Sequence, residues 1–272
     1  MRIRTYGTSG PMVIVLHGGP AAVGEAAPIA RGLGDSFRVL EPWQRGSGTE
    51  PLSVARHVAD LHEVVKTRCD EARPALVGHS WGAMLALAYA AEHPDSAGAL
   101  VLIGCGTFDP VARARMREIL DERIDDQLRR RLERLPEEYS DPSERLRKRY
   151  ELIKPLYSYA PVTSNQEELA EPFDMRAHEE TWGDMVRLQD EGVYPAAFAA
   201  IKEPILMLHG GFDPHPGQMI RASLEPYLPQ LEFREWERCG HSPWLERAVR
   251  DEFFAVLRKW LTRHMTEDSP TS

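Results

Sequence analysis

The segment Gly78-His79-Ser80-Trp81-Gly82 holds the residue types that a reactive serine requires. It matches the pattern G-x-S-x-G and stands between an expected strand and an expected helix. A serine on so tight a turn has a strained backbone, and the residues two positions away must be glycine or similarly small. The N–H groups at the start of the helix can stabilise a developing oxyanion. We therefore predict that Ser80 is the nucleophile of an acyl-transfer reaction.

A serine hydroxyl is nearly unreactive at neutral pH, so it needs a general base, and the base needs an acid that orients it. His241 follows the last expected strand and is the candidate base. Asp213 follows the expected strand 205–208 and is the candidate acid, with Asp109 as an alternative. Because the carboxyl ends of parallel strands meet at one edge of a sheet, we expect Asp213 and His241 to converge on Ser80.

The sequence His-Gly-Gly-Pro at positions 17–20 follows the first expected strand of the core and can bring backbone N–H groups to the same edge. A tetrahedral oxyanion needs two donors, and each missing donor costs about 3 kcal/mol. We assign them to the N–H groups of Gly19 and Trp81, with a purely structural glycine turn as the alternative. Gly18 and His79 are expected to line the substrate site.

No metal or cofactor is expected. His209, Asp213 and His215 are close in sequence, but they match neither H-x-H-x-D nor H-E-x-x-H. The three cysteines are widely spaced and include no C-x-x-C pair, which argues against a zinc site or a disulfide framework. They are Cys69, Cys105 and Cys239.

The composition excludes several classes of partner. With 42 acidic and 33 basic residues, the formal charge of −9 offers no footprint for a nucleic-acid backbone. No run of about 18 apolar residues occurs, so we expect no membrane segment and a cytoplasmic protein. The expected partner is a small-molecule or short-peptide substrate.

Short apolar runs alternate with helical patterns over most of the chain, which predicts an α/β fold with a mostly parallel central sheet flanked by helices. The expected strands are 13–16, 37–40, 75–77, 100–103, 205–208 and 231–236. The expected helices that flank the sheet include 53–73, a segment from 84 to about 93, and 245–261.

This alternation stops after residue 107. The segment from about 112 to 135 is charged and has a helical pattern, and no strand pattern returns before Pro204. We therefore expect a core domain of residues 1–107 and 201–272, with residues 108–200 inserted as a helical cap.

Taken together, these residues resemble the α/β-hydrolase superfamily over nearly the whole chain, in the order Ser80, Asp213, His241. Three segments resemble the proline iminopeptidase group of serine aminopeptidases: 17–20, the Gln-Arg-Gly-Ser-Gly of 44–48, and 80–82. The resemblance implies cleavage of an N-terminal residue, often proline, and a cap that supplies acidic groups for the substrate ammonium. The candidate acids are Glu167, Glu168, Glu171, Glu179 and Glu180.

Three positions depart from that group. Ala21 stands where the group usually has glycine, Trp43 where it usually has aspartate, and His79 where glycine is commoner. A carboxylesterase or lactonase therefore stays open beside the aminopeptidase, because all of them share the same triad. A ligand-binding protein on the same fold, without catalysis, is the alternative from another class.

Overall fold

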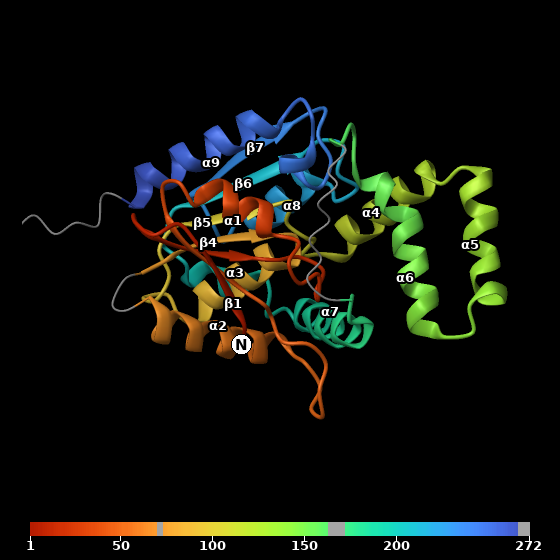
Figure 1. The fold of residues 1–272 in the computed structure, drawn as a ribbon, viewed down its shortest axis with the longest axis horizontal. Coiled ribbons are helices and arrows are strands. Elements are labelled where there is room, and N and C mark those ends of the chain that lie inside the picture. Colours follow the sequence, from red (N-terminus) through yellow and green to blue (C-terminus); the bar gives the residue numbers. More distant parts are fainter. Residues whose placement is uncertain (70–72, 163–171, 266–272) are drawn as a thin grey trace, which may run out of the picture.

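The computed structural model describes residues 1–69, 73–162 and 172–265. Within them, seven strands form one sheet in the order β1-β3-β2-β4-β5-β6-β7 (Figure 1). All neighbouring strands are parallel except β1 and β3. The strands are β1 Ile3–Tyr6, β2 Met12–Leu16, β3 Arg38–Pro42, β4 Ala75–His79, β5 Leu100–Ile103, β6 Ile205–Gly210 and β7 Leu231–Trp236. The predicted α/β-hydrolase type of fold is confirmed.

Helices cover both faces of the sheet because the central strands are apolar on both sides. Along β2, Ile14 packs into one core cluster and Val13 and Val15 into the other, as the two-residue period of a strand requires. The first cluster includes α2 Val54–Arg68, α3 Trp81–Glu92 and α8 Gly217–Leu224. The second includes α1 Ala27–Leu33 and α9 Arg250–Met265.

The edge strand β1 was not expected from the sequence. It is short and half-exposed, so it has no apolar run, and it is held by a polar contact with its neighbour β3. Glu41 of β3 is fully buried, and its carboxylate binds the Arg4 guanidinium at 2.7 Å and the Tyr6 hydroxyl at 2.9 Å. A buried carboxylate needs such partners, and two of them lie on β1.

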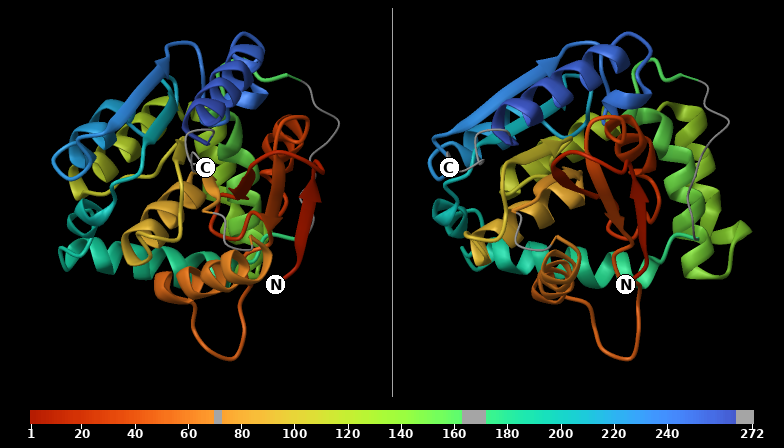
Figure 2. Two further views of the ribbon diagram at one scale, coloured as in Figure 1. Left: turned by 90° about the vertical axis from the view of Figure 1, so that its left-hand side faces the viewer. Right: turned by 60° about the vertical axis from the view of Figure 1, so that its left-hand side comes forward.

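The helices between β5 and β6 are α4 Pro110–Arg123, α5 Asp126–Glu138, α6 Pro142–Ile153, η1 Lys154–Tyr157, α7 Met175–Asp190 and η2 Ala196–Ala200. The α5–α6 hairpin projects away from the sheet, whereas α7 runs beside α2 (Figures 1 and 2). The helical stretch predicted over 112–135 is divided between two helices, because the backbone leaves the helix at Ile124 and Asp125 caps a new one. Its carboxylate accepts the N–H of Leu128 at 2.7 Å. Whether residues 108–200 form a separate cap stays a prediction.

The last helix begins at Arg250 rather than at the predicted Leu245, because the residues before it hold another segment in place. The buried carboxylate of Glu246 accepts the N–H groups of Gly240, Tyr159 and Ala160 at 2.7–2.9 Å. The His241 N–H donates to the Tyr157 carbonyl at 2.8 Å. The end of η1 and the residues after it are therefore bonded to the loop that carries His241.

No helix within the described ranges has both the length and the apolar character needed to cross a membrane.

Candidate active site

Ser80 lies on the turn between β4 and α3, with φ 54° and ψ −117°. The backbone of a residue other than glycine is strained at positive φ, and such strain is typical of functional sites. A Cβ on Gly78 would collide with the Gly82 carbonyl, and a Cβ on Gly82 would collide with the Leu16 carbonyl of β2. Both glycines of the motif are therefore required sterically, as the sequence pattern predicts.

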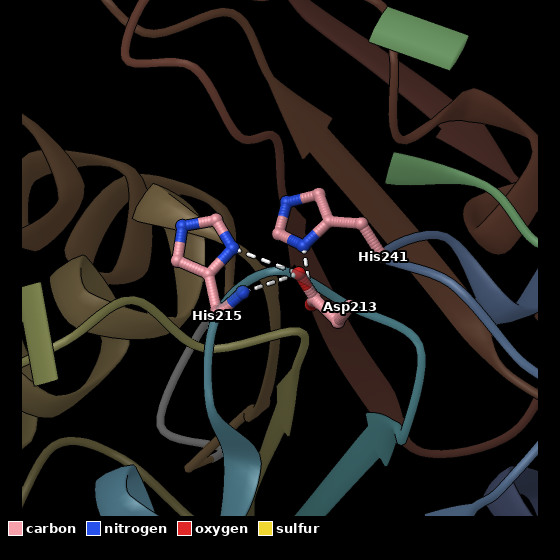
Figure 3. A group of neighbouring side chains, drawn as sticks. All are labelled: Asp213, His215 and His241. Carbon is pink, nitrogen blue, oxygen red and sulfur yellow. Dashed lines mark hydrogen bonds and ion pairs between the residues drawn. The ribbon is translucent and has the colours of Figure 1, made fainter. Parts of the chain in front are cut away.

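Asp213 and His241 are brought together by the loops after β6 and β7 (Figure 3). His241 Nδ1 lies 2.6 Å from Asp213 Oδ2, and the Asp213 residue is only 3% exposed. Burial by itself would raise the pKa of Asp213, but its electrostatic interactions and hydrogen bonds with His241 and His215 hold that pKa well below its usual range. Asp213 is therefore an ionised acceptor for His241.

The alternative acid, Asp109, has a different use. Its Oδ1 accepts the N–H of Ala112 at 2.8 Å and so caps α4.

The loop after β2 turns sharply, with positive φ at two of its residues. Gly19 has φ +115°, a conformation that glycine adopts without strain, and Ala21 has φ 74° where the resembling group has glycine. The Gly18 N–H already donates to Glu25 Oε2 at 3.0 Å. The N–H of Trp81 stands at the start of α3, where amides have no partner within the helix.

Glu25 and His79 form a second carboxylate–histidine pair that sequence reasoning missed. Glu25 Oε1 lies 2.8 Å from His79 Nδ1, and His79 Nε2 lies 3.1 Å from the His241 carbonyl oxygen. Burial would raise the pKa of Glu25, but the nearby His79 lowers it to about 2. This ion pair thus joins the Gly18 loop, the residue before Ser80 and the His241 loop. No spacing pattern marks Glu25, because its side-chain partner His79 lies on a distant segment.

A second histidine, His215, also binds Asp213. Its Nδ1 and its backbone N–H both lie 2.9 Å from Asp213 Oδ1 (Figure 3). The rings of His215 and His241 stack with centroids 4.7 Å apart and planes at 22°. Tyr157 packs against both rings, with centroid distances of 5.9 and 5.6 Å.

In the described part of the chain, Asp213, His215 and His241 are a group whose ligand atoms could reach one metal ion, since all lie within 4.8 Å of one another. The two imidazole rings are nearly parallel, however, and both direct Nδ1 at the carboxylate. Nitrogen lone pairs on parallel rings do not converge on one point as a metal site needs. We therefore treat the group as a hydrogen-bonded cluster.

Acidic side chains of α7 bind the core rather than an open pocket. Glu180 accepts the N–H of Leu52 at 2.8 Å and pairs with Arg176 at 2.7 Å. Asp184 accepts the N–H of Val54 at 2.8 Å. Glu179 is exposed, and Glu167, Glu168 and Glu171 lie outside the described residues. Of the two described candidate acids, Glu180 is therefore engaged in structural contacts. Among the described residues, no contact directs the exposed Glu179 toward Ser80.

The comparison with known families follows this geometry. Residues 13–255 match the model of the alpha/beta hydrolase family. The chain belongs to this family. This α/β-hydrolase is an enzyme of the hydrolase type.

Two relatives are proline iminopeptidases. The one from Neisseria gonorrhoeae is 38% identical over 118 residues, which are 40% of this chain and only 37% of that relative's length. The one from Lactobacillus helveticus is 22% identical over 272 residues, covering 93% of this chain and 90% of the relative. A solved esterase from Thermogutta terrifontis superposes with a TM-score of 0.62 at 21% identity, over 97% of this chain and 93% of that one. Such a likeness shows the fold alone.

Proposed function

We propose that this α/β-hydrolase is a serine hydrolase in which Ser80 is the nucleophile, His241 the general base and Asp213 the acid that orients it. The contacts of His241 carry the proposal. Its Nδ1 is hydrogen-bonded to buried Asp213, and its carbonyl lies within 3.1 Å of His79 Nε2, on the residue directly before Ser80. The nucleophile turn, the base and the acid are thus linked through side chains at one edge of the sheet.

In the proposed reaction, Ser80 Oγ forms a bond to the substrate carbonyl carbon while His241 Nε2 takes the hydroxyl proton. The N–H groups of Gly19 and Trp81 hold the oxyanion of the tetrahedral intermediate. His241 then gives the proton to the leaving group, and the bond between carbon and leaving group breaks. Water, deprotonated by His241, releases the acyl group from Ser80 in the same way. The mechanism uses no metal or cofactor.

The proposed substrate is a small amide or the N-terminus of a short peptide. The support comes from the two proline iminopeptidase relatives and from segments 17–20, 44–48 and 80–82, which resemble that group. A carboxylic ester or lactone is the second candidate, because the same nucleophile and oxyanion donors would act on it. Solved esterases of this fold, such as that of Thermogutta terrifontis, keep this alternative open.

Labelling with a fluorophosphonate tests the nucleophile. The wild type and the Ser47→Ala variant are expected to be labelled at Ser80, and Ser80→Ala is expected to remain unlabelled. Ser47 is a matched control because it lies in the exposed loop between β3 and α2, and its hydroxyl binds Asp174 at 2.8 Å. Absence of labelling in the folded wild type would favour a non-catalytic ligand-binding protein.

Turnover of proline β-naphthylamide against p-nitrophenyl acetate separates the two substrate classes. The amide hypothesis expects release of naphthylamine that Ser80→Ala abolishes. Fast ester turnover with no naphthylamide cleavage would refute the peptidase assignment while leaving the serine mechanism intact.

A further inference from the structure

The acid of the proposed triad is shared by two histidines. Asp213 uses Oδ2 for His241 Nδ1, and it uses Oδ1 for both Nδ1 and the backbone N–H of His215. The second histidine enters from Asp213-Pro214-His215, two residues along the same loop. The catalytic-triad pattern requires only one histidine on the acid, so the other has a role still to be explained.

The carboxylate decides the tautomer of both rings. An ionised carboxylate only accepts hydrogen bonds, so the hydrogen of each neutral ring lies on Nδ1 and the lone pair on Nε2. Figure 3 shows both Nε2 atoms on the side of the rings that faces away from Asp213. His215 therefore presents the same chemical form as His241, beside it, with ring centroids 4.7 Å apart.

The two rings compete for one negative charge. A proton on either ring forms an imidazolium that Asp213 stabilises, and a second imidazolium so close would be repelled. The nearest other imidazole, that of His209, is engaged elsewhere. His209 Nε2 lies 3.4 Å from Asp213 Oδ2 but binds the His215 carbonyl at 2.9 Å. The other titratable or charged groups around the cluster are Arg123, Tyr157, Cys105, Cys239, His79 and Glu25.

We propose that His215 is a positioning residue that acts through Asp213. By donating to Oδ1, it fixes the carboxylate with Oδ2 aligned on His241 and draws part of the negative charge away from His241. His241 therefore holds its proton less tightly and remains an effective base at more acidic pH. This inference rests on the proposed function, in which His241 is the base.

The imidazole of His215 can be tested separately from the loop it stands on. The backbone N–H of His215 binds Asp213 Oδ1 whatever the side chain, which is the hydrogen bond of an Asx turn. His215→Phe keeps a flat ring against His241 but lacks the N–H donor. His215→Asn is the conservative rescue, because its side-chain amide carries an N–H donor close to the position of the imidazole Nδ1.

The first test is the pH dependence of the fluorophosphonate labelling rate and of kcat/KM. In His215→Phe, the acid limb is expected to move to higher pH, because His241 then has the carboxylate to itself. We expect kcat to fall about 3- to 10-fold with KM unchanged, through loss of alignment. His215→Asn should keep the wild-type acid limb. Identical profiles in all three proteins, or the same shift in both variants, would overturn the proposal.

The second test needs no activity. Nitrogen-15 NMR of the histidine rings should find His215 and His241 of the wild type in the Nδ1–H form above neutral pH. It should also find His241 taking up its proton at higher pH in His215→Phe. An Nε2–H form of His215 would refute the inference, even if His215→Phe failed to fold. If the wild type is not labelled at Ser80, the proposed function fails, whereas this titration still decides the role of His215.

Discussion

Two carboxylate–histidine pairs lie at the same edge of the sheet. The residues of the first were predicted from the sequence to meet, whereas the second was found only in the structure. Asp213 and His241 follow neighbouring strands and share a hydrogen bond of 2.6 Å. Glu25 lies in the loop after β2 and His79 is the last residue of the neighbouring strand β4. Glu25 Oε1 and His79 Nδ1 are 2.8 Å apart. In both pairs the acid is held ionised by a histidine, yet only the first orients the proposed base. Similar electrostatics would then serve the proposed proton transfer in one pair and the placement of the backbone in the other.

Removing the acid of the first pair should have the largest effect. Asp213→Asn is expected to lower kcat about 10⁴-fold, because an amide no longer fixes the tautomer of His241 or stabilises its charge. The measurement is steady-state turnover of the best substrate from the amide and ester screen, with circular dichroism confirming the fold. A loss of less than about tenfold would mean that another carboxylate fills this role.

Removing the negative charge of Glu25 in the second pair should lower kcat less than Asp213→Asn does, and for a different reason. Glu25→Gln is expected to lower kcat about 100-fold, because Gly18 and the neighbouring Gly19 amide lose their fixed position relative to Ser80. The acid limb of the pH profile should move only slightly, and toward lower pH, because the Glu25 carboxylate is charge-coupled to His241 but exchanges no proton in the reaction. A Glu25→Gln variant whose acid limb moved strongly while kcat stayed constant would break the distinction between the two pairs.

The second pair should also be visible in stability at acid pH. The pKa of Glu25 is lowered to about 2 from 4.5, so its contribution is present above pH 4.5 and is lost as pH falls toward 2. The free energy of unfolding should therefore fall by about 2 kcal/mol more in the wild type than in Glu25→Gln between pH 5 and pH 3. Urea unfolding at the two pH values measures this difference. Parallel losses in both proteins would show that Glu25 is not held ionised by His79.

The parts of the site that follow from local geometry were predictable from the sequence. The turn around Ser80 is set by steric limits on its two glycines, and the sheet follows from apolar runs of the right length. Residues 80, 213 and 241 were expected to come together because parallel strands end at one edge. Asp213 and His241 do meet there, while the role of Ser80 stays a prediction that labelling will test.

Features that depend on contacts between distant segments were not predictable. Glu180 and Glu246 bind backbone amides far away in sequence, and Glu25 pairs with the distant His79. Nothing in the local pattern of these acids distinguishes them from exposed acids. The break at Ile124 was missed for another reason. The apolar spacing runs through it without interruption, and the cap formed by Asp125 acts against that spacing.

The buried carboxylate of Glu246 has a mechanical consequence for the base. Because it binds both Gly240 and the amides of Tyr159 and Ala160, the segment after η1 and the histidine loop form one hydrogen-bonded unit. Rotation of that segment away from the sheet would pull the loop and reorient the imidazole of His241 with it. Opening of the site on this side and displacement of the proposed base would then be a single event, and the α5–α6 hairpin would take part in it, because α6 continues directly into η1.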